Sequence, residues 1–296
     1  MRSAAVFCLA ACFIAAGCGG SSSAQEEPDA STLEALWRAP GEDVAVVPGA
    51  ADFRPGDVRF PFLVIDGQGR VVTRPTARIW LARGLKSTPF ARTTAASESI
   101  GVGKSEPGEP AHIFVAHLKL PEAGTYWLLA EPVGGRQIQA VGTVVVKPRT
   151  TAPDVGAKAI ASATPTLDDA TLEQLTTSNM PDRELYTRSV AAALAAKEPF
   201  VLAFATPKYC TSRTCGPVVD VLSAVRRTHE GDGIRFIHTE IYEDNDPSKG
   251  ENRWVKEWKL PSEPWVFLVG SDGKITTRFE GTVSVAELEA AVQKLK

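Results

Sequence analysis

Two cysteines, Cys210 and Cys215, have the clearest chemical potential in this sequence. They follow a continuous apolar run at residues 200–205, of the kind that forms a fully buried strand. Gly216 and Pro217 come next and predict a helix start, because the missing N–H of a proline costs nothing in the first turn. The free amides and dipole at a helix N-terminus favour a thiolate over a thiol. The spacing therefore predicts a cysteine pair where a buried strand passes into a helix.

Two interpretations of this pair remain open. In the first, one sulfur is a nucleophile that attacks a substrate disulfide and the other resolves the mixed disulfide. Lys208 and Arg213 flank the pair and would stabilise a thiolate. In the second, the pair is a structural disulfide that closes an exposed turn, which can contribute ~2 kcal/mol. Whether the protein is an enzyme depends on which interpretation holds.

The first twenty residues predict export from the cytoplasm. Arg2 is followed by an apolar segment at residues 4–16 that is too short to cross a bilayer stably. Residues 15–18, Ala-Ala-Gly-Cys, resemble a bacterial lipobox, which implies cleavage before Cys18 and lipid attachment to that residue. The alternative is simple secretion. We expect a lipid-anchored protein on the extracytoplasmic face of the cell membrane.

The cysteine count and the net charge indicate the redox state of the cysteines and the kind of partner. Cys8 and Cys12 would leave with the signal peptide, so only Cys210 and Cys215 would remain as thiols in an oxidising compartment. A disulfide between them is the default expectation there. The formal net charge is −3 with no long basic run, which argues against nucleic acid as a partner.

The rest of the chain divides by composition into five segments. They are a signal peptide (1–17), a tether (18–42), a β-rich domain (43–147), a Pro/Thr/Ala linker with its lead-in (148–180) and a mixed domain (181–296). A helix is expected from Pro181 through Ala196 in the last of these. The long segment 85–110 has no packing pattern and is expected to be a loop.

About seven short strands in the β-rich domain favour a β-sandwich. A late step, Ala123-Gly124-Thr125-Tyr126, resembles the corner that opens a late strand in immunoglobulin-like domains, so we expect an immunoglobulin-like β-sandwich at 43–147. The expected strands cover residues 44–47, 58–65, 71–73, 77–82, 113–120, 125–130 and 138–146.

The order of elements at 181–296 resembles the α/β thioredoxin-like fold. The residues that carry this resemblance are the 204–206 approach to Cys210, the Glu263-Pro264 step before a strand, and a terminal hairpin around Asp272-Gly273. The resemblance implies that Pro264 is cis and that Glu263, Pro264 and Trp265 contact a substrate. The whole chain is also similar to actinobacterial-type lipoproteins with a C-terminal thioredoxin domain.

The cysteine spacing departs from that family, whose oxidoreductases carry C-x-x-C where this chain has C-x-x-x-x-C. If Cys210 occupies the nucleophile position, Cys215 must reach back to it; if Cys215 occupies that position, Val218 replaces the second cysteine. A disulfide across the longer spacing is possible because only the Cα separation and the Cβ directions matter.

The leading hypothesis is thiol–disulfide exchange with exported proteins or a redox partner, without a metal or other cofactor. The competing hypothesis is a redox-silent binding module with a structural disulfide. A copper chaperone, with His238 as the third ligand beside the two sulfurs, is a weaker alternative, because a histidine inside an alternating strand is more often a packed side chain.

Overall fold

The computed structural model describes residues 31–38, 42–102, 110–134, 138–210 and 215–295, without the side chains at 42, 43, 138 and 215. The predicted signal peptide and the lipid attachment site at Cys18 lie outside the described residues. None of the helices in the described ranges has the length and apolar composition needed to cross a bilayer.

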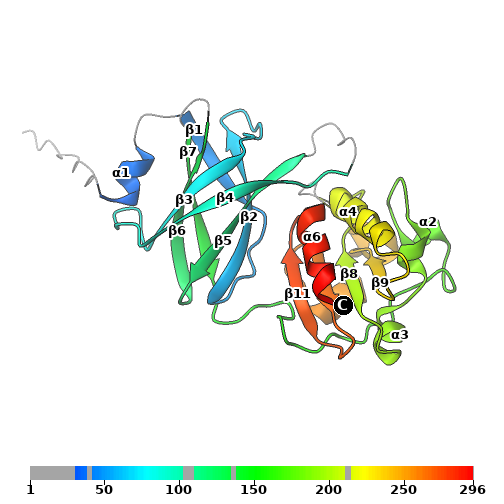
Figure 1. Ribbon diagram of the computed structural model, residues 1–296. Coiled ribbons are helices and arrows are strands. Elements are labelled where there is room, and N and C mark those ends of the chain that lie inside the picture. The colour runs from blue at the N-terminus through cyan, green and yellow to red at the C-terminus, as the bar shows by residue number, and fades with distance from the viewer. Residues whose placement is uncertain (1–30, 39–41, 103–109, 135–137, 211–214, 296) are drawn as a thin grey trace, which may run out of the picture.

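Seven strands in the N-terminal half of the chain form a closed barrel (Figure 1). Hydrogen-bonded neighbours follow the order β1-β2-β5-β4-β3-β6-β7, and a parallel pairing of β1 with β7 closes the ring. Alternate apolar side chains fill the interior, as in β2, where Phe60, Phe62 and Val64 are buried. The strands are β1 (Glu42–Pro48), β2 (Gly56–Asp66), β3 (Thr76–Ala82), β4 (Ala91–Ser99), β5 (His112–Leu120), β6 (Gly124–Pro132) and β7 (Ile138–Val146).

The barrel corrects the predicted immunoglobulin-like sandwich. The number of strands was right, but their membership was not: Val71 forms only an isolated bridge to Ile65, and the expected loop at 85–110 contains β4. A sandwich and a barrel can share the same alternating strands, and what separates them here is the β1–β7 pairing across nearly a hundred residues. The pairing of β1 with β7 cannot be predicted from a local sequence pattern, because the two strands are far apart in the chain.

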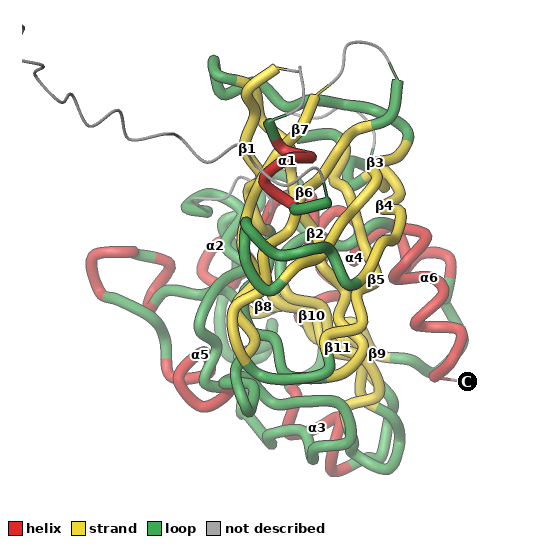
Figure 2. Tube along the Cα trace, turned by 90° about the vertical axis from the view of Figure 1, so that its left-hand side faces the viewer, coloured by secondary structure: helices red, strands yellow, loops and turns green. Residues whose placement is uncertain are grey.

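A short helix, α1 (Leu33–Trp37), packs on the barrel within the segment expected to be a tether. Thr32 begins it by accepting a hydrogen bond from the Ala35 amide at 3.2 Å. Leu33 is fully buried with Leu129 of the barrel. Figures 1 and 2 place this helix on the side of the barrel away from the C-terminal half of the chain.

The C-terminal half contains a four-stranded sheet in the order β11-β10-β8-β9. β8 and β9 are parallel, while β10 is antiparallel to both β8 and β11. The strands are β8 (Phe200–Phe204), β9 (Arg235–Thr239), β10 (Trp265–Val269) and β11 (Ile275–Glu280). The β8 and β10 side chains are fully buried, because helices cover both faces of the sheet (Figure 2).

Helices α4 and α6 pack on one face of this sheet, and α3 and α5 pack on the other. The α-helices are α2 (Leu172–Leu175), α3 (Val190–Ala195), α4 (Cys215–Thr228), α5 (Arg253–Trp258) and α6 (Val285–Val292). The 3₁₀ helices are η1 (Arg183–Tyr186), η2 (Glu243–Asn245), η3 (Pro247–Lys249) and η4 (Gln293–Leu295).

The fold class is mostly β, with 35% of the described residues in strands and 23% in helices. The assignment is therefore corrected from a sandwich followed by a thioredoxin-like α/β domain to a seven-stranded barrel with a second, smaller sheet. The helix expected at 181–196 is also shorter than predicted. It is interrupted before Ser189, whose hydroxyl accepts from the Ala192 amide and starts the shorter α3, leaving only η1 upstream.

Specific polar contacts join the barrel to the second sheet. The guanidinium of Arg59 donates to both carboxylate oxygens of Glu287, at 2.6 and 2.8 Å. Burial acts to raise the pKa of Glu287, but the hydrogen bonds and charge of Arg59 outweigh it and hold that pKa below its ordinary value. Arg278 of β11 donates to the backbone oxygen of Asp52 at 2.6 Å. The barrel half of the chain therefore contacts α6 through an ion pair and β11 through a hydrogen bond to the loop between β1 and β2.

Candidate functional site

Cys210 lies in the turn that follows β8 and precedes α4. Its side chain is half-buried, packs against the core under α4 and is disulfide-bonded. Cys215 is the first residue of α4, and its side chain, like residues 211–214, lies outside the described part of the chain. The expected placement of Cys210 after a buried strand is confirmed, whereas its pairing with Cys215 stays a prediction.

The Glu263–Pro264 peptide bond lies beside the same strand end. It is cis, as expected. Because Trp265 pairs with Phe204, the residues just before β10 lie next to those just after β8. Burial, followed by the charges of Glu240 and Glu251, raises the pKa of Glu263 to about 7.

The predicted substrate residue Trp265 belongs to the core in this structure. Its side chain is fully buried and its ring stacks on Phe267, with centroids 5.5 Å apart. The indole N–H donates to Ser262 Oγ at 3.2 Å, and Ser262 Oγ donates to Glu280 at 2.7 Å. Since Glu280 also accepts from the Asp52 amide of the barrel at 2.7 Å, the segment before β10 is tied to both sheets.

A buried carboxylate, Glu240, lies at the end of β9 and is linked to the cysteine turn. Its Oε1 accepts from the Thr177 amide at 2.6 Å and from the Thr177 and Thr176 hydroxyls at 2.9 and 3.3 Å. The Thr177 hydroxyl oxygen in turn accepts from the Lys208 amide at 3.1 Å. A single residue, Thr177, therefore connects Glu240 to the turn that carries Cys210.

His238 is a packed, neutral histidine. Its Nε2 faces the backbone oxygen of Ala205 at 3.0 Å, and its Nδ1 faces the Tyr186 hydroxyl at 2.7 Å. A carbonyl can only accept, so Nε2 carries the proton and Nδ1 accepts from the tyrosine. Burial lowers the pKa of His238. Both nitrogens are thus used, and among the described residues no group of three or more His, Cys, Asp and Glu could hold a metal ion.

Unsatisfied polar atoms gather at this edge of the sheet. Five buried side-chain oxygen or nitrogen atoms of the described residues have no hydrogen-bond partner, and four of them lie within two positions of the paired row Phe204–Thr239–Trp265. These four are Thr206 Oγ1, Thr239 Oγ1, Glu240 Oε2 and Glu263 Oε2. Burying such groups without partners is costly, so this edge is a candidate functional site.

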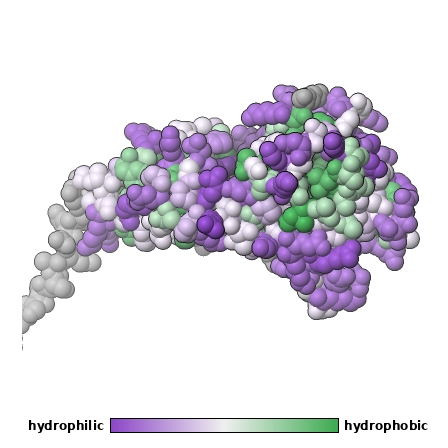
Figure 3. Space-filling view, turned by 90° about the horizontal axis from the view of Figure 1, so that it is seen from below, coloured by the Kyte–Doolittle hydropathy of each residue, from purple (hydrophilic) through white to green (hydrophobic). Residues whose placement is uncertain are grey.

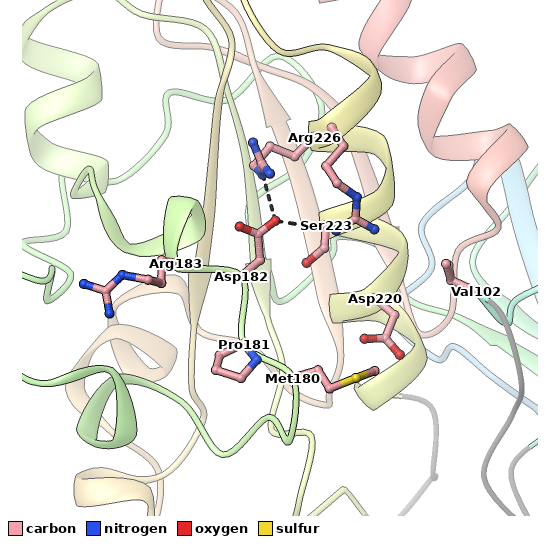
Figure 4. A pocket seen from close by; sticks show the side chains of 9 residues that line it. Val102, Met180, Pro181, Asp182, Arg183, Asp220, Ser223 and Arg226 are labelled. Carbon is pink, nitrogen blue, oxygen red and sulfur yellow. Dashed lines mark hydrogen bonds and ion pairs between the residues drawn. The ribbon is translucent and has the colours of Figure 1, made fainter.

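A second region, along α4, is less suited to bind a charged ligand. A cavity of about 420 Å³ lies between α4 and residues 180–183 (Figure 4). Asp182 points across it and accepts from Arg226 Nε at 2.8 Å, with Arg227 at 3.9 Å. Its central charges are therefore paired with each other.

The face of the molecule shown in Figure 3 is mostly hydrophilic. In the view of Figure 3, apolar surface gathers on the half of the molecule that carries the second sheet. The buried groups without hydrogen-bond partners at the β8–β9 edge are more informative about function than this surface.

Sequence reasoning identified Cys210, Glu263 and Pro264 at this edge but missed Glu240. The signal was present, since Glu240 shares a side of its strand with Phe236 and His238, both of which are buried. A carboxylate on the buried side of an apolar strand is rare unless it has a partner, so it is a candidate functional group.

Comparison with known proteins gives no family assignment. No family model matches the sequence, and no curated protein matches it. The thioredoxin-like identification, with its similarity to lipoproteins that carry a thioredoxin domain, is therefore corrected. It rested on short motifs, and short motifs at a strand end do not define a fold family.

Proposed function

We propose that this protein carries out thiol–disulfide exchange at Cys210, with Cys215 as the second sulfur, on the extracytoplasmic side of the membrane. The observation that supports this best is the half-buried, disulfide-bonded Cys210 in the turn between a buried strand and the fourteen-residue helix α4. The amides at the N-terminus of such a helix stabilise a thiolate released there.

The exchange balances in two steps. A substrate thiolate attacks one sulfur of the protein disulfide, a mixed disulfide forms, and the other protein sulfur leaves as a thiolate. A second substrate thiolate then attacks the mixed disulfide and releases the substrate as a disulfide. The substrate loses two electrons and two protons, and the protein gains them as two thiols. The reverse sequence reduces a substrate disulfide.

Glu263 and Pro264 are proposed to contact the substrate beside this turn. The membrane location rests on the predicted lipid attachment at Cys18, and a Cys18→Ala chain should consequently leave the membrane fraction.

The test is exchange between the full chain and bis(2-hydroxyethyl) disulfide, a small neutral substrate. The reduced protein should convert the disulfide to thiol, and the C210S and C215S variants should each lose that turnover. C215S should instead accumulate a mixed disulfide at Cys210 that mass spectrometry detects. A reduction potential well below about −300 mV, with no turnover, would contradict exchange.

That last outcome would favour the second candidate, a binding module with a structural disulfide. The observation in its favour is the packing of Cys210 against the core under α4. Two thiol pKa values near 8.5 in the reduced protein would point the same way, because neither sulfur would then be activated.

A further inference from the structure

The carboxyl end of α4 carries a buried histidine that the proposed exchange does not use. His229 directly follows Thr228, the last residue of the helix, and only 7% of it is exposed. Its Nδ1 lies 2.7 Å from Asp232 Oδ2 in the following turn, and its Nε2 lies 2.7 Å from Glu289 Oε2 of α6. The imidazole ring is therefore held between two carboxyl groups, with one on each nitrogen.

These two contacts need a proton on each ring nitrogen. An ionised carboxylate can only accept a hydrogen bond, so both nitrogens of His229 must donate. A neutral imidazole has one N–H group and an imidazolium has two. By contrast, the nitrogens of His238 face one acceptor and one donor, and a single proton satisfies them. The surroundings of His229 thus fit the charged ring, through two charge-assisted hydrogen bonds.

The position at a helix end favours the same charge for an independent reason. The carbonyl groups in the last turn of a helix carry a partial negative charge, which stabilises a protonated histidine. The His229 amide donates to the Val225 and Arg226 carbonyl oxygens at 3.2 and 3.1 Å, so this residue closes α4. The guanidinium groups of Arg226 and Arg227 face Asp182 instead, at 2.8 and 3.9 Å.

Acidic side chains face the ring from each element that contacts it. The turn after α4 provides Asp232, and the neighbouring Glu230 is exposed. Helix α6 provides Glu289, whose other carboxylate oxygen is hydrogen-bonded to the Thr228 hydroxyl. Since both nitrogens of His229 are engaged, none is left to bind a metal ion. The ring proton is consequently part of the contact between α4 and α6.

We propose that His229 is a proton-dependent clasp between α4 and α6, closed in the imidazolium form and loosened when the proton passes to solvent. In the neutral ring one nitrogen keeps a lone pair, which repels a carboxylate oxygen at 2.7 Å. The two helices have different neighbours, because α4 begins at Cys215 and α6 contacts Arg59 of the barrel through Glu287. The clasp therefore joins the helix of the cysteine turn to the helix that contacts the barrel.

The direction of the pH effect follows from proton binding. A histidine in an unfolded chain is mostly neutral above pH about 7. The clasp keeps the His229 proton in the folded chain at that pH, so the folded state binds more protons than the unfolded state. The stability that the clasp contributes is consequently present at pH about 6 and is lost as pH rises toward about 9.

The first test is the protonation of the ring nitrogens in the full chain, read by ¹⁵N NMR at pH about 7.5. His229 should show two protonated nitrogens and His238 only one, and the His229→Gln variant identifies the signals by their loss. In Glu289→Gln the new amide can donate to Nε2, so the neutral ring is satisfied and His229 should lose one proton at this pH. The exposed Glu230→Gln should leave both protons in place. One protonated nitrogen in the original chain, or two in Glu289→Gln, would overturn the proposal.

The second test is urea unfolding at pH about 6 and about 9, where the equilibrium constant for unfolding should rise at least about threefold more in the original chain than in His229→Gln. Glu289→Gln should resemble His229→Gln and provides the same comparison where that variant does not fold. Glu230→Gln should resemble the original chain. An equal rise in the original chain and in the clasp variants would overturn the proposal. Neither measurement involves the cysteines, so their outcome is independent of the proposed exchange.

Discussion

At the scale of single residues, the edge near Cys210 places two carboxyl groups close enough to influence one another. Glu240 raises the pKa of Glu263, second only to the effect of burial. Glu263 is thus a group that changes charge near pH 7, beside a cis peptide bond and a cysteine turn. Above pH 7 its negative charge opposes a thiolate nearby, and below pH 7 it does not.

Replacing this carboxyl by an amide should change how stability depends on pH. The folded protein holds the Glu263 proton up to pH about 7, whereas the unfolded chain releases it near the ordinary value of 4.5. The folded state therefore binds more protons between these limits, and stability falls as pH rises through them. Because the side chain is partly exposed, we expect an effect of about 1 kcal/mol rather than the full conversion.

Glu263→Gln should accordingly be more stable than the original chain at pH 8 and similar to it at pH 4.5. Urea unfolding at several pH values measures this, with the exposed Glu230→Gln as the matched control. An unchanged pH slope in Glu263→Gln would show that Glu263 ionises as an ordinary carboxyl.

At the scale of elements, the helix that contacts both sheets is fixed at its first turn. Ser284 accepts from the Glu287 amide at 3.1 Å, and its own amide donates to Glu287 Oε2 at 3.2 Å. The Ser284 hydroxyl also donates to Glu98 of β4 at 3.1 Å. The start of α6 is therefore held both by its own capping box and by the barrel.

Ser284→Ala should remove these contacts and lower the free energy of unfolding by about 1–2 kcal/mol. Chemical denaturation compares it with Ser271→Ala, an exposed serine in a hairpin turn, which should be nearly neutral. Equal stability of the two variants would mean that the cap does not contribute.

The sequence predicts elements where large apolar residues alternate and fails where they do not. The ranges expected for β5 and β7 agree with the structure to within one residue. β4 was missed because its residues are small or polar and only Ala95 is buried, so it shows no hydrophobic period. At the candidate site, Cys210 and Pro264 carry local signals. The bridge from Glu240 through Thr177 joins residues 63 positions apart, which no local pattern encodes.

At the scale of the whole molecule, the barrel and the second sheet approach each other at backbone distance. Gly281, at the end of β11, has a φ of 74°, and a Cβ added there would overlap the carbonyl oxygen of Gly49. The same region carries the chain of hydrogen bonds from Asp52 through Glu280 and Ser262 to Trp265. The barrel thus helps to position the segment that contains Glu263 and Pro264.

Gly281→Ala should separate this packing effect from the cost of positive φ. Gly273 has the same φ of 74°, but a Cβ there would meet only a side-chain atom of Leu194 at 3.4 Å. Both alanine variants pay the conformational cost, and Gly281→Ala should lose about 1–3 kcal/mol more through overpacking. If urea unfolding gives the same loss of unfolding free energy for both variants, the contact between the two sheets tolerates the extra methyl group and the predicted overpacking is wrong.

Helix α1 packs on the side of the barrel that faces away from the second sheet, and this position matters if the protein is held at its N-terminus. The described chain enters the barrel at α1, and the body of the barrel lies between α1 and α4, the helix that follows the cysteine turn (Figure 1). A chain that is held at its N-terminus would therefore carry the cysteine turn on the side of the barrel opposite its attachment.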